Sequence, residues 1–201
     1  MKRFIVRFLA FAATAFAANV SFGESIEISK ANDFIKYCGS SRTYSKYDTI
    51  ILTKDITLSG DIDLNKNLTI TSGGDKTYSI IVNNSRQFEV RPGYTLTLSN
   101  VTFDGRDYAS RNEGLFYLHA SSDSTKIARL VLEKGATIKN VTVTSSTRAD
   151  YAVIHVQKGA RLIMNDGATI INCHNKSYYG NGGAICCDSG NIIINGGVIT
   201  G

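Results

Sequence analysis

The sequence predicts an all-β fold, a solenoid of parallel strands with a short N-terminal capping helix, and three observations support this. From Asp48 onward, short segments rich in Val, Ile, Leu, Thr and Tyr alternate apolar and polar residues, which indicates half-buried strands. Glycine or asparagine separates these segments every few residues. The unit also recurs, as GATIKN at residues 135–140 and GATIIN at residues 167–172. An antiparallel sandwich or barrel would share the alternation, but the repeats favour stacked coils.

The N-terminus begins like an export signal. Lys2, Arg3 and Arg7 precede an uncharged run, FLAFAATAFAA, at residues 8–18. A positive start followed by a short apolar core is typical of a secretory signal peptide, and a membrane span needs roughly 20 apolar residues. We therefore predict a signal peptide over residues 1–23, cleaved after Ala17 or Gly23, rather than a buried helix. The mature protein is expected to be secreted or held at the cell surface or outer membrane, without a transmembrane helix.

Residues 24–46 are expected to form an N-terminal cap that contains one amphipathic helix. In SKANDFIKYCG, the apolar residues fall on one helical face at the spacing i, i+3, i+4 and i+7: Ala31, Phe34, Ile35 and Cys38. Ser29 is the predicted N-cap and Gly39 the predicted C-cap. The first coil of a solenoid exposes its core and strand edge, so this helix is interpreted as a lid.

Residues 47–201 are predicted to form the coils of the solenoid, with asparagine at sharp turns. Asparagine accepts a left-handed backbone more readily than other non-glycine residues, and stacked coils place equivalent side chains about 4.8 Å apart. The spacing of the repeats predicts one internal ladder made of Asn100, Asn140, Asn165 and Asn195. Asn172 provides a competing register.

The last residues, INGGVITG at 194–201, form a repeat in progress, and no capping helix, charged strand or proline follows them. The β-helix repeats are therefore predicted to lack a C-terminal cap. Because terminal coils normally need a polar cap, the chain is expected to be a fragment of a longer repeat protein or to stack end to end on another chain. The alternative is that side loops shield the edge.

Two segments carry a family resemblance: GARLIMNDGATIINCHN at residues 159–175 and GNGGAICCDSGNIIINGGVITG at residues 180–201. They resemble the repeats of right-handed parallel β-helix proteins of the pectin-lyase-like superfamily. The GGAI at residues 182–185 is similar to the repeat of polymorphic outer-membrane and adhesin-like proteins. The resemblance implies a right-handed parallel β-helix, and it implies either an adhesin-like binding protein or an enzyme acting on polysaccharides.

The richest candidate for chemistry is FDGRDYASR, whose charged residues are Asp104, Arg106, Asp107 and Arg111. In a pectate-type lyase, Lys or Arg would act as the base and the acidic residues would hold Ca²⁺ beside the substrate carboxylate. The simpler interpretation is a solvated loop. The chain has no NTD, DD or RIK motif, which disfavours a glycoside hydrolase of this fold. The three histidines, at positions 119, 155 and 174, have no evident nucleophile partner and are expected to be packed or exposed.

The other residue types add few sites. The four cysteines, Cys38, Cys173, Cys186 and Cys187, are expected to be free thiols that are mostly buried, rather than disulfides. A metal set of the late cysteines with His174 is disfavoured, because it lacks a Cys-x-x-Cys unit. Several tyrosines lie in or beside irregular segments, and we expect them either to stack on sugar rings or to fill the packing between loops: Tyr108, Tyr117, Tyr151, Tyr178 and Tyr179.

The balance of charges argues against a nucleic-acid partner. The formal net charge is +5, but without the three basic residues of the signal segment, 19 basic and 17 acidic residues nearly balance. We therefore expect no nucleic-acid partner.

The sequence predicts an exported, non-enzymatic, adhesin-like protein that contacts a polysaccharide or cell-surface glycan, without a cofactor. The alternative is a polysaccharide lyase, or a degenerate relative of one, that uses Ca²⁺.

Overall fold

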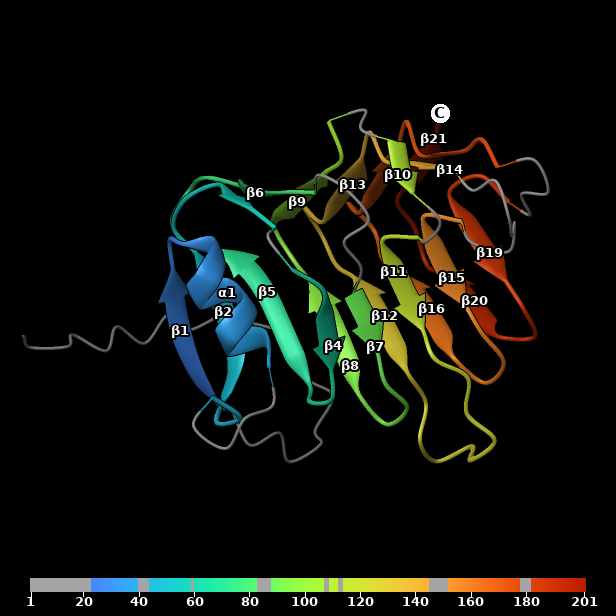
Figure 1. The fold of residues 1–201 in the computed structure, drawn as a ribbon, viewed down its shortest axis with the longest axis horizontal. Coiled ribbons are helices and arrows are strands. Elements are labelled where there is room, and N and C mark those ends of the chain that lie inside the picture. Colours follow the sequence, from blue (N-terminus) through green and yellow to red (C-terminus); the bar gives the residue numbers. More distant parts are fainter. Residues whose placement is uncertain are drawn as a thin grey trace, which may run out of the picture.

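The chain folds as a parallel β-helix whose coils stack along one axis (Figure 1). The computed structural model describes residues 23–39, 44–58, 60–82, 88–106, 114–144, 152–177 and 182–201, and the backbone of 109–111. The predicted signal peptide, apart from Gly23, therefore lies outside the described residues. Within the described part of the chain, no helix combines the length and the hydropathy needed to cross a bilayer.

Every strand pair that defines the sheets is parallel, so the antiparallel sandwich is excluded. The seven-stranded sheet contains, in spatial order, β1 (Glu24–Ile28), β2 (Tyr47–Leu52), β5 (Leu68–Ser72), β8 (Thr95–Leu98), β12 (Arg129–Leu132), β16 (Arg161–Met164) and β20 (Asn191–Ile194). The six-stranded sheet contains β3 (Ile56–Thr57), β6 (Tyr78–Ile81), β9 (Val101–Asp104), β13 (Thr137–Lys139), β17 (Thr169–Ile171) and β21 (Val198–Thr200).

The remaining strands form two smaller sheets. The five-stranded sheet contains β4 (Ile62–Leu64), β7 (Phe88–Val90), β11 (Phe116–Leu118), β15 (Ile154–Val156) and β19 (Ile185–Cys187). The three-stranded sheet contains β10 (Ala109–Arg111), β14 (Thr142–Thr144) and β18 (His174–Asn175). Each coil visits the seven-, six- and five-stranded sheets in turn, so residues about 30 positions apart in sequence become neighbours.

The repeated hexapeptide reflects this stacking directly. Thr137 of the first copy pairs with Thr169 of the second, and Ile138 pairs with Ile170. Both isoleucines are fully buried, while the threonines beside them point outward. The two copies are therefore one structural position in successive coils.

Asparagine turns are present, but the single predicted ladder is wrong. Asn140 and Asn172 follow β13 and β17 at the same register, with left-handed φ angles of 55° and 51°. Asn172 Nδ2 donates a hydrogen bond to Asn140 Oδ1 at 3.4 Å, and Asn140 Nδ2 donates to Asp104 Oδ1 at 3.1 Å. The competing register with Asn172 is therefore the one that the fold adopts.

The other predicted ladder members lie elsewhere. Asn100, with φ 46°, lies before β9, at the register position of Gly135. It is therefore at the opposite end of the strands from Asn140, which follows β13. Asn165 and Asn195 follow β16 and β20 and form a separate pair, in which Asn195 Nδ2 donates to Asn165 Oδ1 at 2.8 Å. Sequence spacing cannot tell these turns apart, because both ends of a strand favour the same residue.

We expect Asn140→Ala to lower the free energy of unfolding by about 1–3 kcal/mol, because it removes two side-chain hydrogen bonds and strains a left-handed turn. Asn140→Gly, which accepts the same φ without strain, should cost less. Urea denaturation of both variants measures the difference. Equal losses would show that the left-handed backbone adds nothing at this turn, and no loss in either variant would contradict the prediction.

The lid helix is confirmed, with corrections to its ends. α1 (Ala31–Cys38) lies at the N-terminal end of the stack and buries Phe34 and Cys38 completely (Figure 1). Its N-cap is Lys30 rather than Ser29, and it makes no side-chain cap. Gly39 is the C-cap but has φ −67°, so the turn does not require glycine there. One strand that the sequence did not predict, β1, precedes the helix and pairs with β2.

The last coil exposes apolar side chains at the end of the stack, among them Ile192 and Ile199, whose register partners Leu162 and Ile170 are fully buried. Five residues of β20 and β21 are between 37% and 57% exposed: Ile192, Ile193, Ile194, Val198 and Ile199. End-to-end self-association stays a prediction. The four cysteines are free, as predicted; three are buried and only Cys187 is exposed.

Candidate functional site

The predicted lyase segment is only partly assembled in the described structure. Asp104 ends β9 and serves the turn beside it: its Oδ1 accepts hydrogen bonds from the Arg106 backbone N–H and from Asn140. Lys139 forms an ion pair with its Oδ2 at 3.3 Å. Burial alone would raise the pKa of Asp104, but these hydrogen bonds and the lysine lower it below its ordinary value.

Asp104 is therefore a carboxylate that supports the fold. Arg106 lies in the turn after it with a left-handed φ of 48° and an exposed side chain. Asp107 lies outside the described residues, and of Arg111 only the backbone, in β10, is described. Of the predicted tyrosines, only Tyr117 is described, in β11. The described residues thus bring Asp104 and Arg106 together only through one backbone hydrogen bond.

A denser set of polar side chains lies on the outer side of the five-stranded sheet. Alternate residues of each strand point into the core, so those between them point outward. The parallel register aligns the outward residues of successive coils in one row: Asp63, Glu89, Tyr117, His155 and Cys186. A second row lies two residues further along the last four of these chain segments: Arg91, His119, Gln157 and Asp188. We call these nine side chains the polar face.

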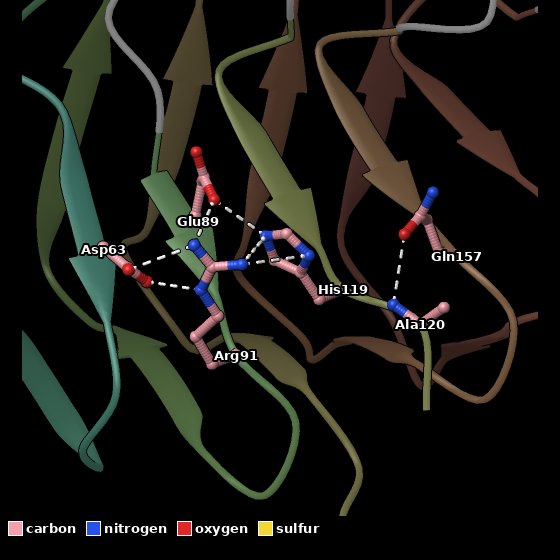
Figure 2. Close-up of polar contacts among 6 residues, drawn as sticks. All are labelled: Asp63, Glu89, Arg91, His119, Ala120 and Gln157. Carbon is pink, nitrogen blue, oxygen red and sulfur yellow. Dashed lines mark hydrogen bonds and ion pairs between the residues drawn. The ribbon is translucent and has the colours of Figure 1, made fainter. Parts of the chain in front are cut away.

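Arg91 is the centre of one half of the polar face (Figure 2). Its guanidinium forms a two-pronged hydrogen bond with Asp63, at 2.6 and 3.0 Å, and an ion pair with Glu89 at 2.9 Å. The hydrogen bond with Asp63 is the main reason that the pKa of Arg91 is raised above its ordinary value. Arg91 is thus a fixed cation whose planar group is held in one orientation.

His119 has two alternative partners in the same cluster. Its Nε2 lies 2.8 Å from Glu89 Oε2 and 3.0 Å from Arg91 NH1 (Figure 2). Glu89 accepts a hydrogen bond from Nε2 when that nitrogen carries a proton, whereas Arg91 donates to Nε2 when it does not, so the tautomer of the imidazole selects the partner. Glu89, Arg91 and His119 therefore form a coupled group that can accept or donate a hydrogen bond toward solvent.

Tyr117 joins this cluster to the other half of the polar face. Its ring centroid lies 4.7 Å from that of His119 and 5.1 Å from that of His155, both edge to face. Beyond it, His155 Nε2 lies 2.8 Å from Asp188 Oδ2, and the Cys186 thiol lies 4.0 Å from Asp188 Oδ1. The polar face thus continues across all five strands.

Gln157 is fixed by a backbone contact between neighbouring coils. Its Oε1 accepts a hydrogen bond from the Ala120 backbone N–H at 3.1 Å (Figure 2). A glutamine held by its oxygen keeps its amide NH₂ group, which is a donor. The outer side of the five-stranded sheet therefore combines donors, acceptors and one aromatic ring on a rigid support.

Sequence reasoning gave the histidines of the polar face no role. The available signal was a pair of polar residues flanking one apolar residue in four strands: E-V-R, Y-L-H, H-V-Q and C-C-D, with cysteine as the middle residue of the last. Such pairs gain meaning only when the coils are aligned, and the uneven length of the connections conceals that alignment.

Comparisons with known proteins give one family. The family model described as "Domain of unknown function (DUF4957)" matches residues 54–195, which includes all five strands that carry the polar face. No curated protein and no solved structure matches the chain.

Proposed function

Because this chain belongs to the DUF4957 family, whose description assigns no activity, we propose its function from the polar face. The protein acts as an exported, non-enzymatic module at the cell surface, adhesin-like in role, that binds a glycan on the outer side of the five-stranded sheet. The pectin-lyase-like resemblance of its repeats agrees with a polysaccharide ligand.

One observation carries the proposal: hydrogen-bonding side chains occupy the outward positions of every strand in this sheet. Parallel strands lie about 4.8 Å apart, so the face offers a long, regular array of groups. A glycan presents hydroxyl groups that both donate and accept hydrogen bonds, together with apolar ring faces. Arg91 and Gln157 supply donors, Glu89 and Asp188 supply acceptors, and Tyr117 supplies an aromatic surface.

The charge of the polar face indicates which glycans it favours. Among its described side chains, three carboxylates (Asp63, Glu89 and Asp188) accompany a single guanidinium, Arg91. Arg91 is already paired with two of these carboxylates, so little positive charge remains to attract an anion. Neutral or amine-bearing glycans therefore suit this face better than polyuronates.

We expect a glycan array probed with the exported chain to give binding to neutral or amine-bearing sugars. For the best ligand, Arg91→Ala should weaken affinity about tenfold or more, because a hydrogen bond to a charged group contributes about 1.5–3 kcal/mol. The matched control is Thr97→Ala, an outward residue of β8 in the seven-stranded sheet. Calorimetric titration measures both. Binding that Thr97→Ala weakens as much as Arg91→Ala does would place the contact elsewhere.

The alternative function is a pectate-type lyase, or a degenerate relative of one, that uses Asp104, Arg106, Asp107 and Arg111 with Ca²⁺. What favours it is the position of this charged segment at the end of β9, on a scaffold that resembles pectin-lyase-like proteins. Incubation with polygalacturonate and Ca²⁺ discriminates the two, because elimination leaves an unsaturated product that absorbs in the ultraviolet. Product that disappears in Asp107→Ala would overturn the non-enzymatic proposal.

A further inference from the structure

At one end of the polar face, three side chains of different donor type converge. One ring nitrogen of His155, the Cys186 Sγ and an Asp188 carboxylate oxygen all lie within 4.8 Å of one another. His155 is only 2% exposed and Cys186 only 7% exposed, whereas the Asp188 side chain is 57% exposed. The cluster is thus closed on the protein side and open to solvent on the side of Asp188.

The fold, rather than local sequence, builds this arrangement. His155 of β15 and Cys186 of β19 are direct register partners, so their outward side chains lie one above the other. Asp188 follows Cys186 by two residues on the same side of the chain, and its backbone N–H continues the ladder by donating to Val156. All three positions are therefore set by backbone hydrogen bonds between coils.

We propose that His155, Cys186 and Asp188 bind a transition-metal ion of the Zn²⁺ type. The mixture of thiolate, imidazole and carboxylate matches the ligands that Zn²⁺ takes in proteins. Calcium and magnesium prefer oxygen ligands alone, so this donor set selects against both. The proposal rests on the geometry of these three side chains and not on glycan binding, although Asp188 belongs to both sites.

The distances agree with such a site. With metal–ligand bonds of about 2.0–2.3 Å in tetrahedral geometry, neighbouring ligand atoms lie about 3.3–3.6 Å apart. The present separations are 2.8 Å between His155 Nε2 and Asp188 Oδ2 and 4.0 Å between Cys186 Sγ and Asp188 Oδ1. The two distances run to different oxygens of Asp188, so its exposed side chain must rotate for one oxygen to bind the ion together with His155 and Cys186. Three protein ligands leave a fourth position for water or another small ligand, on the solvent side.

The alternative metal set considered from sequence, the late cysteines with His174, is not assembled. Cys173 is buried, and its thiol donates to the carbonyl oxygens of Ile138 and Ile171. Burial is the main cause that raises the pKa of the Cys173 thiol to about 11, so it is a poor source of thiolate. The histidine that joins Cys186 is His155, 31 residues earlier in the chain.

The test is a calorimetric titration of the tag-free chain with zinc, in the presence of a non-thiol reductant. We expect one Zn²⁺ per chain, and Cys186→Ser, His155→Gln and Asp188→Asn should each weaken affinity at least about tenfold, since even changes around metal ligands cost 10–100-fold. Cobalt should give a thiolate-to-metal absorption band that Cys186→Ser removes. An excess of Ca²⁺ or Mg²⁺ should not compete.

Two matched controls guard against a chance thiol or imidazole site. Cys187→Ser changes the adjacent exposed cysteine, and His174→Gln changes an exposed histidine; both should leave zinc affinity unchanged. Asp188→Asn decides the outcome if the buried His155 variant does not fold, because Asp188 is mostly exposed. Zinc affinity that survives Asp188→Asn and Cys186→Ser, or that Cys187→Ser abolishes, would overturn the proposal.

Discussion

Phe88→Ala is expected to lower the free energy of unfolding by about 3–5 kcal/mol, the usual cost of removing a fully buried aromatic ring. Phe88 is 0% exposed and sits at the centre of an aromatic cluster inside the coils. Its ring centroid lies 5.4 Å from that of Phe103 and 5.5 Å from that of Phe116. It also lies 6.3 Å from Phe34 of the lid helix, so the truncation loosens contacts in two coils and the cap.

The neighbouring residue provides the matched control for this prediction. Glu89 follows Phe88 in β7, but its side chain points outward into the polar face. Glu89→Gln should therefore change stability by less than about 1 kcal/mol, as is usual for partly exposed ion pairs. Urea denaturation followed by circular dichroism measures both variants. Similar losses at positions 88 and 89 would mean that the inward and outward registers of β7 are exchanged.

The architecture was predictable because every coil of a solenoid has the same packing requirements. Each coil must bury the same kind of apolar face, so Ile138 and Ile170 recur in nearly identical hexapeptides and reveal the stacking. β1 was missed for the opposite reason: it is an edge strand with one neighbour and is largely exposed, so its glutamates are tolerated and its apolar pattern is weak. The turn asparagines were recognised, but their register was not, because Asn100 and Asn140 satisfy the same backbone requirement at opposite ends of the strands.

The polar face was beyond the reach of single-sequence reasoning. Outward positions carry no burial constraint, so their chemistry depends on which residue lies in the next coil. Arg91 meets His119 across 28 residues, and His155 meets Asp188 across 33 residues. The segment that sequence favoured, around Asp104, stood out because its charges are adjacent in the chain. In the fold, Asp104 instead accepts a hydrogen bond from Asn140 and forms an ion pair with Lys139.

One buried cation connects the N-terminal cap to the coils. Lys66 precedes β5 and is only 8% exposed. Its Nζ donates hydrogen bonds to the backbone carbonyl oxygens of Tyr37, Tyr44 and Tyr47, at 2.7, 3.1 and 2.8 Å. Tyr37 belongs to the last turn of α1 and Tyr47 begins β2, so one ammonium group ties the lid helix, the following turn and the first long strand to the coils.

Lys66→Met should therefore destabilise the protein by about 3 kcal/mol. Methionine fills nearly the same volume as the lysine stem, so the loss reports three charge-assisted hydrogen bonds rather than a cavity. The control is Lys76→Met, whose side chain is exposed and whose replacement should have little effect. Urea denaturation gives the global loss, and hydrogen exchange should show faster exchange in α1 than in the central coils. If the two lysine variants were equally stable, the lid would be held by the packing of Phe34 and Cys38 alone.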